Sequence, residues 1–88
     1  MPPQEQMSIK QLLTADSARI RELAKWLIDC DQYLLLFADN NLVILTKNDI
    51  DYFIAFWNRQ FIKLFWDTDQ KPKQFKTISE LFDYLKAN

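Results

Sequence analysis

Residues 52–66 carry apolar side chains at more positions than one face of a helix can hold, and this pattern limits the possible folds most. The aromatic members of the stretch are Tyr52, Phe53, Phe56, Trp57, Phe61, Phe65 and Trp66. As a helix, the stretch would form one apolar stripe from Ile50 to Phe65. It would leave several large apolar side chains off that stripe, facing water. These off-stripe residues are Tyr52, Phe56, Ile62 and Trp66.

A hairpin with its loop at 58–60 accommodates all of these side chains, because successive strand residues point to opposite faces of a sheet. Tyr52 then lies opposite Trp66, Ile54 opposite Leu64, and Phe56 opposite Ile62, which makes one wholly apolar face. The other face carries Phe53, Ala55, Trp57, Phe61, Lys63 and Phe65. We therefore predict a hairpin, supported by the preference of aromatic and β-branched residues for strands. The alternative is a mostly α-helical fold with one β-hairpin, in which residues 49–66 form a helix.

Helical periodicity and capping residues mark both ends of the chain. Ser8 and Gln11 form a capping box at a short first turn, and residues 17–30 follow with apolar side chains at helical spacing. Thr77 and Glu80 form a second capping box, and the apolar stripe that begins at Ile78 continues to Leu85. These patterns predict one helix over 17–30 and another over 77–86.

The middle of the chain favours strands. Residues 33–38 and 41–46 are apolar runs that flank "ADNN", and Asp-Asn and Asn-Asn pairs tolerate the positive φ angles of tight turns. Residues 71–76, "KPKQFK", have the composition of a loop. The predicted fold is therefore α+β: an N-terminal helix, a four-stranded antiparallel meander and a C-terminal helix, with the helices on one face. Residues 8–88 form a single domain after a disordered lead, residues 1–7.

Two residue types are missing from the 88-residue chain, which contains no His and no Gly. Histidine is the commonest general base and metal ligand, and the phosphate-binding and nucleophile-elbow motifs need glycine for their backbone geometry. Cys30 is flanked by carboxylates, which oppose formation of a thiolate. We therefore expect no enzyme, no catalytic residue, no metal site and no cofactor, and a structural role for Cys30.

Charge and hydropathy narrow the location and the partners. The formal net charge of −1 argues against a dedicated nucleic-acid binder, which usually carries a basic excess. The longest uncharged apolar run, "YLLLFA", is too short to span a bilayer, and the N-terminus lacks the pattern of a signal peptide. We expect a cytoplasmic protein with no membrane partner.

The aromatic share of 15% is the feature that rises above a typical composition. A thin two-layer domain has one core, so a sheet that is apolar on both faces needs a cover for its second face. Exposed apolar patches of this kind mark partner interfaces, whose centres are rich in aromatic residues and Arg. We expect a small non-enzymatic protein–protein interaction module, such as an adaptor, inhibitor or regulatory subunit, which docks on another protein or on a second copy as a homodimer. The predicted partner-binding residues are Phe53, Trp57, Arg59, Phe61, Lys63 and Phe65.

The alternative function uses the basic segment at 71–76. Lys71, Lys73 and Lys76 surround Phe75, and single-stranded nucleic-acid surfaces combine basic residues with stacking rings. These three lysines are the candidate residues for a single-stranded nucleic-acid or anionic-ligand binding domain.

Overall fold

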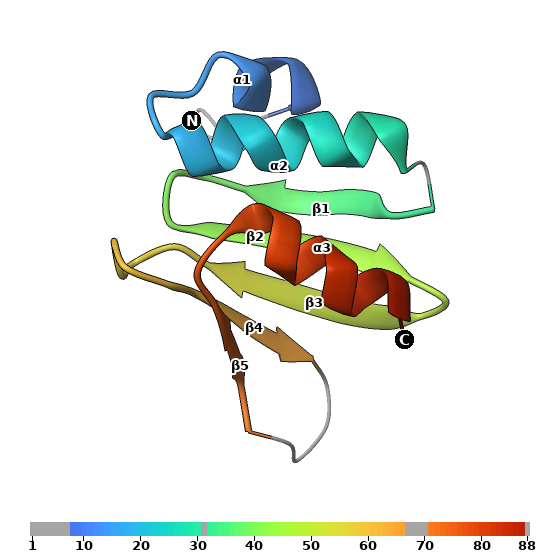
Figure 1. The fold of residues 1–88 in the computed structure, drawn as a ribbon. Helices are drawn as coiled ribbons and strands as arrows, with labels where there is room; N and C mark the ends of the chain where they lie inside the picture. The colour runs from blue at the N-terminus through green and yellow to red at the C-terminus, as the bar shows by residue number, and fades with distance from the viewer. Residues whose placement is uncertain (1–7, 31, 67–70, 88) are drawn as a thin grey trace, which may run out of the picture.

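The computed structural model describes residues 8–30, 32–66 and 71–87, which form three helices and one antiparallel sheet (Figure 1). The helices are α1 (Ile9–Leu13), α2 (Ala18–Asp29) and α3 (Ile78–Ala87). The strands are β1 (Leu34–Ala38), β2 (Leu42–Lys47), β3 (Ile50–Ala55), β4 (Ile62–Trp66) and β5 (Lys73–Phe75). The predicted α+β class, with helices at both ends of a meander, is confirmed. The predicted disordered lead, residues 1–7, lies outside the described residues.

The sheet follows the chain, because its strand order is β1-β2-β3-β4-β5 and each neighbouring pair is antiparallel. Strands β3 and β4 form the predicted hairpin, with Tyr52 opposite Trp66 and Ile54 opposite Leu64. The helical alternative for residues 49–66 is wrong. Two apolar faces are stable on a strand of a wide sheet, whereas a single helix would have exposed half of these side chains to water.

The sheet has five strands and not the predicted four. Residues 73–75, which we predicted as part of a loop, form β5 and pair with the edge of β4, Lys63 opposite Gln74 and Ile62 opposite Phe75. An unpaired strand edge offers a row of N–H and C=O groups to any nearby segment. Three residues that include Lys and Gln carry too little β preference to reveal this pairing in the sequence.

Side-chain caps begin the helices where the sequence predicts them. The Ser8 hydroxyl accepts a hydrogen bond from the Gln11 N–H, and the Gln11 side chain accepts one from the Ser8 N–H, so the first capping box is complete. At α3 the Thr77 hydroxyl accepts from the Glu80 N–H at 3.1 Å. The Glu80 carboxylate turns instead to the N–H of Lys76, at 3.0 Å. Each arrangement satisfies backbone donors that the first turn of a helix leaves unpaired.

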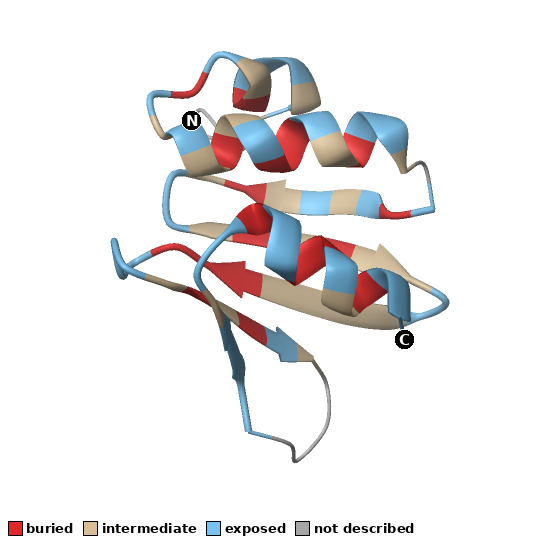
Figure 2. Cartoon of the chain, in the orientation of Figure 1, coloured by how far each residue is buried: buried red, intermediate tan, exposed pale blue. Residues whose placement is uncertain are grey.

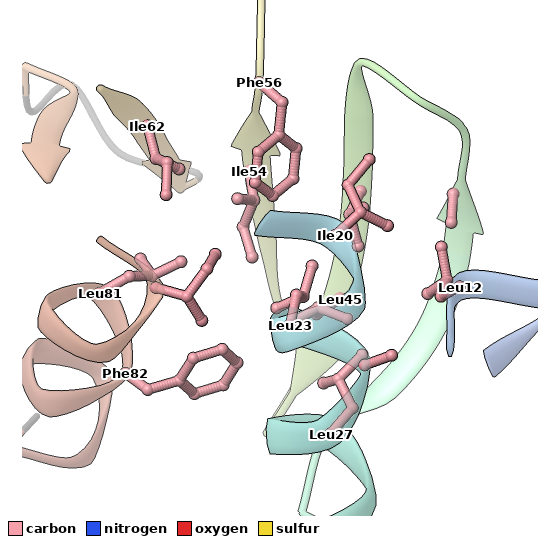
Figure 3. Close-up of a cluster of buried hydrophobic side chains, with 14 of the residues drawn as sticks. Leu12, Ile20, Leu23, Leu27, Leu45, Ile54, Phe56, Ile62, Leu81 and Phe82 are labelled. Atoms are coloured by element: carbon pink, nitrogen blue, oxygen red, sulfur yellow. The ribbon is translucent and has the colours of Figure 1, made fainter. Parts of the chain in front are cut away.

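The core lies between one face of the sheet and the helices (Figures 2 and 3). Figure 1 shows α2 and α3 on the same side of the sheet, and α1 packs beside α2. We call this side the core face of the sheet. Its fully buried strand residues are Ala38, Val43, Leu45, Ile54, Ile62 and Leu64. They pack with buried residues of the helices, of which Leu12, Ile20, Leu23, Leu81 and Phe82 are fully enclosed.

The β2–β3 turn is built without glycine. Asn48 and Asp49 both adopt the left-handed region, with φ of 55° and 65°. Positive φ at both central residues is the signature of the tight type I′ hairpin turn, and its twist matches that of the strands. Asn and Asp tolerate this region better than other side chains do, so they take the place that glycine would have here.

Substitutions at neighbouring residues of β4 should separate the two faces of the sheet. Leu64→Ala removes a fully buried side chain of the core and should lower the free energy of unfolding by about 2–5 kcal/mol. Phe65→Ala, one residue later on the opposite face, should cost about 1 kcal/mol in the isolated chain, the value of a cross-strand pair. Urea unfolding followed by circular dichroism in dilute solution measures both. Equal losses would contradict the assignment of a single core.

The same substitution in two loops should have opposite effects. Asn48→Gly relieves a side chain held at positive φ and should stabilise the chain by about 0.5 kcal/mol. Asn58→Gly removes a side-chain oxygen that accepts from the N–H groups of Gln60 and Phe61 at 2.7 and 3.3 Å, and it should destabilise the chain by about 1 kcal/mol. Thermal melts of both variants provide the comparison, and a loss for Asn48→Gly would contradict the turn assignment.

Candidate functional site

The second face of the sheet, which we call the outer face, carries a row of large apolar side chains across four strands. Because strand residues alternate, the neighbours of the buried core residues point to this face. The register aligns Phe37 opposite Ile44, Ile44 opposite Phe53 and Phe53 opposite Phe65. Leu34 and Leu42 lie on the same face beside this row. The row is therefore a continuous apolar band from the edge strand β1 to β4.

No helix among the described residues covers the outer face. The buried residues of α1, α2 and α3 all belong to the single core cluster on the other side of the sheet. Leu34 keeps 68% of its surface exposed, Trp57 66% and Phe65 38%. Ala55 is the exception, because it is 3% exposed on the outer face yet outside the core cluster. Within the band, Phe37, Ile44 and Phe53 are half-buried and Phe65 is exposed, and all four lie outside the core cluster.

A small hollow of about 140 Å³ sits at one end of the outer face. Its lining includes Ala55, Trp57, Phe61 and Lys63. The small Ala55 side chain, which pairs with Lys63 across the strands, sets the depth of the hollow. The Lys63 ammonium lies 5.9 Å from the centroid of the Phe61 ring, within the range of a cation–π contact. This end of the outer face therefore combines aromatic walls with one positive charge.

The loop that carries Trp57 and Arg59 is held by Arg19 from the first turn of α2. The guanidinium donates to the carbonyl oxygens of Asn58 at 2.8 Å, Phe56 at 3.1 Å and Phe61 at 3.4 Å. It also lies 5.4 Å from the centroid of the Phe56 ring. Hydrogen bonds from a charged donor are stronger than neutral ones. The rim of the outer face is consequently pre-organised by the helix layer on the other side of the sheet.

The structure brings together the predicted partner-binding residues. Phe53, Lys63 and Phe65 are on the outer face, and Phe61 and Trp57 line its hollow. Arg59 is exposed in the adjoining loop. Sequence reasoning missed four further apolar residues of the outer face: Leu34, Phe37, Leu42 and Ile44. Their signal was the apolar character of both faces of the 33–46 hairpin, but the alignment of that hairpin with β3 is a tertiary property.

The three lysines of the alternative function are engaged separately. The Lys73 ammonium lies 5.7 Å from the Tyr84 ring centroid, on α3. Lys76 lines a different hollow together with Gln60 and Phe61, and Lys71 is exposed. A groove for a nucleic-acid backbone requires a continuous row of positive charge. All three lysines are exposed, and Lys73 and Lys76 have different described neighbours.

The described residues form few other arrangements that could support catalysis or metal binding. No polar or charged side chain of the described chain is buried, and no cluster of three or more acidic or thiol side chains within it could hold a metal ion. Cys30 is a free, half-buried thiol that caps the end of α2, where its N–H donates to the Trp26 carbonyl at 2.9 Å. None of the described helices has the length and apolar character needed to cross a bilayer.

Comparisons of the chain with models of protein families, with curated protein sequences and with solved structures find no match. Its function is therefore inferred from the outer face and the residues around it.

Replacing Arg19 tests whether the rim depends on α2. Arg19→Met keeps the aliphatic stem but removes the donor for three carbonyl groups, and it should lower stability by about 1–3 kcal/mol. The amides of Gln60 and Phe61 should lose protection in hydrogen exchange, because the loop is no longer held. Lys25→Met, at an exposed position of the same helix, is the matched control and should change neither quantity. Unchanged hydrogen exchange at the Gln60 and Phe61 amides in Arg19→Met would contradict the role of Arg19 in holding the loop.

Proposed function

We propose that this protein is a non-enzymatic protein-interaction module that docks through its outer face, and that the surface it meets is the outer face of a second copy. The observation that carries this proposal is the band from Phe37 to Phe65, which no described helix covers. A whole aromatic side chain has a surface of about 150–250 Å². The exposed fractions of Trp57 and Phe65 alone therefore leave on the order of 200 Å² of apolar surface in water. With the rest of the band, the exposed apolar area reaches the few hundred Å² that mark an interaction site.

The charges of the outer face favour a second copy over an unrelated partner. Among the described residues of β1 to β4, the outer face bears one carboxylate, Asp51, and one ammonium, Lys63, near opposite ends of the adjoining strands β3 and β4. Lys63 pairs with Ala55, which is four residues from Asp51 along β3, so the two charges are separated by about 13 Å along the strand. A surface with both signs of charge at opposite ends complements itself. The formal net charge of −1 adds little repulsion between copies.

The positions of these charges define a two-fold axis. The point midway between Asp51 and Lys63 lies between Phe53 and Phe65, which pair directly across β3 and β4. A two-fold axis in the plane of the interface through this point exchanges the two charges. Each Asp51 then lies opposite Lys63 of the second copy, and the four phenylalanines meet around the axis. The interface would have an aromatic centre and charged flanks, the usual anatomy of a specific interface.

The same axis fixes the angle at which the strands of the two sheets cross. With strands about 4.8 Å apart and charges about 13 Å apart along the strand, the axis is tilted about 20° from the perpendicular to the strands. Rotation about it crosses the strands of the two sheets at about 40°. Sheets that pack face to face in sandwiches keep their strands within about 30°. The charge pairing therefore gives a crossing about 10° wider than that of aligned sandwiches.

A charge exchange tests this function. Lys63→Asp or Asp51→Lys alone places like charges opposite each other and should weaken self-association about tenfold, whereas the double variant should restore it to within about threefold. Trp57→Ala should weaken self-association without unfolding the chain. Analytical ultracentrifugation over a concentration series measures each dimerisation constant. Glu22→Lys, at an exposed position on α2, controls for net charge.

Two results would count against the proposal, and they are distinguishable. A chain that remains monomeric up to millimolar concentration contradicts the second copy as the occupant. A dimer in which the two charge substitutions act additively contradicts the two-fold register but not the use of the outer face.

A further inference from the structure

The core face of the sheet also has a part that the helices leave open. A hollow of about 340 Å³ lies between the end of α3 and the strands that flank the β2–β3 turn. Its volume falls within the range of small-molecule sites, roughly 300–1,000 Å³.

Aromatic side chains from three elements line this hollow. Tyr52 comes from β3, Trp66 from β4 and Tyr84 from α3, with Leu85 beside them. The centroids of the Trp66 and Tyr84 rings are 5.9 Å apart and the rings are tilted by 40°. Tyr52 and Trp66 are direct partners across the strands. These three rings come from different elements, and a planar ligand could stack on their surfaces.

The charges around the hollow favour an anionic ligand. Lys47 lines it, and the Lys47 ammonium lies 5.2 Å from the centroid of the Tyr33 ring. Lys73 does not line the hollow, but its ammonium lies 5.7 Å from the centroid of the Tyr84 ring, which does. No carboxylate lines the hollow among the residues with assigned positions, and within that same set Lys47 has no ion-pair partner. A cationic ligand would meet the positive charge of Lys47, whereas an anionic one would meet its counter-charge.

Tyr33 does not cancel the charge of Lys47. Burial, together with the neighbouring Tyr52 and Cys30, raises the pKa of Tyr33 from 10.0 to about 12. The phenol therefore stays neutral throughout the physiological range. Lys47 packs against an uncharged ring and keeps its charge available to a ligand.

We propose that this hollow binds a planar aromatic ring that bears an acidic group, with the ring against Tyr52, Trp66 and Tyr84 and the acid on Lys47. The Asn48 amide, at the rim of the hollow, supplies a further polar group beside Lys47. The site lies on the opposite face of the sheet from the proposed dimer interface, so it is independent of that interface. A single planar ring system fits the volume of about 340 Å³.

Three probes of one shape and different charge test the proposal on the full chain. They are 2-naphthoate, the neutral 2-naphthamide and the cationic 2-naphthyltrimethylammonium, each followed by amide chemical shifts in a ¹⁵N correlation spectrum. The naphthoate should bind at sub-millimolar concentration, at least about tenfold more tightly than either comparator, because it alone can form a charge-assisted contact with Lys47. Its shifts should centre on Tyr52, Trp66 and Tyr84.

Substitution of Lys47 provides the matched test. Lys47→Met keeps the aliphatic stem and should weaken binding of the naphthoate about tenfold, while leaving the amide comparator unchanged. Lys86→Met is the control, because the Lys86 ammonium also packs on a ring, 4.2 Å from the Trp26 centroid, outside the hollow. Three results would each overturn the proposal: no naphthoate binding in the unsubstituted chain, shifts centred on the outer face around Phe53, or undiminished affinity in Lys47→Met.

Discussion

The structure depends on one imbalance: the sheet is apolar on two faces, but the described helices cover only one. Ile54 and Leu64 point toward α2 and α3, whereas their neighbours Phe53 and Phe65 point away from them. A domain of this size cannot supply a second layer without a longer chain. In the proposed function, a second copy covers the outer face and removes it from water.

This imbalance couples stability to association. The same strands supply both faces, so the register that aligns the core also aligns the outer band, and a slip of one residue would exchange the two. Arg19 extends the coupling, because it reaches from α2 to the loop that carries Trp57. A rim held in place before binding loses less conformational entropy when a partner arrives. In the proposed interface, the helix layer would thus contribute to docking from the other side of the sheet.

Much of the fold was predictable because its signals are local. The capping residues at Ser8 and Thr77 and the helical spacing of apolar residues identify the helices within one or two turns of chain. The β3–β4 hairpin was predictable for a stronger reason, since its apolar residues fit two faces of a strand but not one face of a helix. Strand β5 was not predictable, because Lys73 and Gln74 pair only where the edge of β4 is present.

The amino-acid sequence alone determines which residues of each strand share a face, because the alternation of side chains is a property of the local backbone. For this reason Phe53, Phe61, Lys63 and Phe65 can be grouped by their spacing in the chain. The alignment of Phe37, Ile44, Phe53 and Phe65 into one band is decided by pairing between strands. The hollow near Lys47 likewise requires α3 to meet β3 and β4. Such contacts join residues far apart in the chain, and their geometry follows from how the whole core packs.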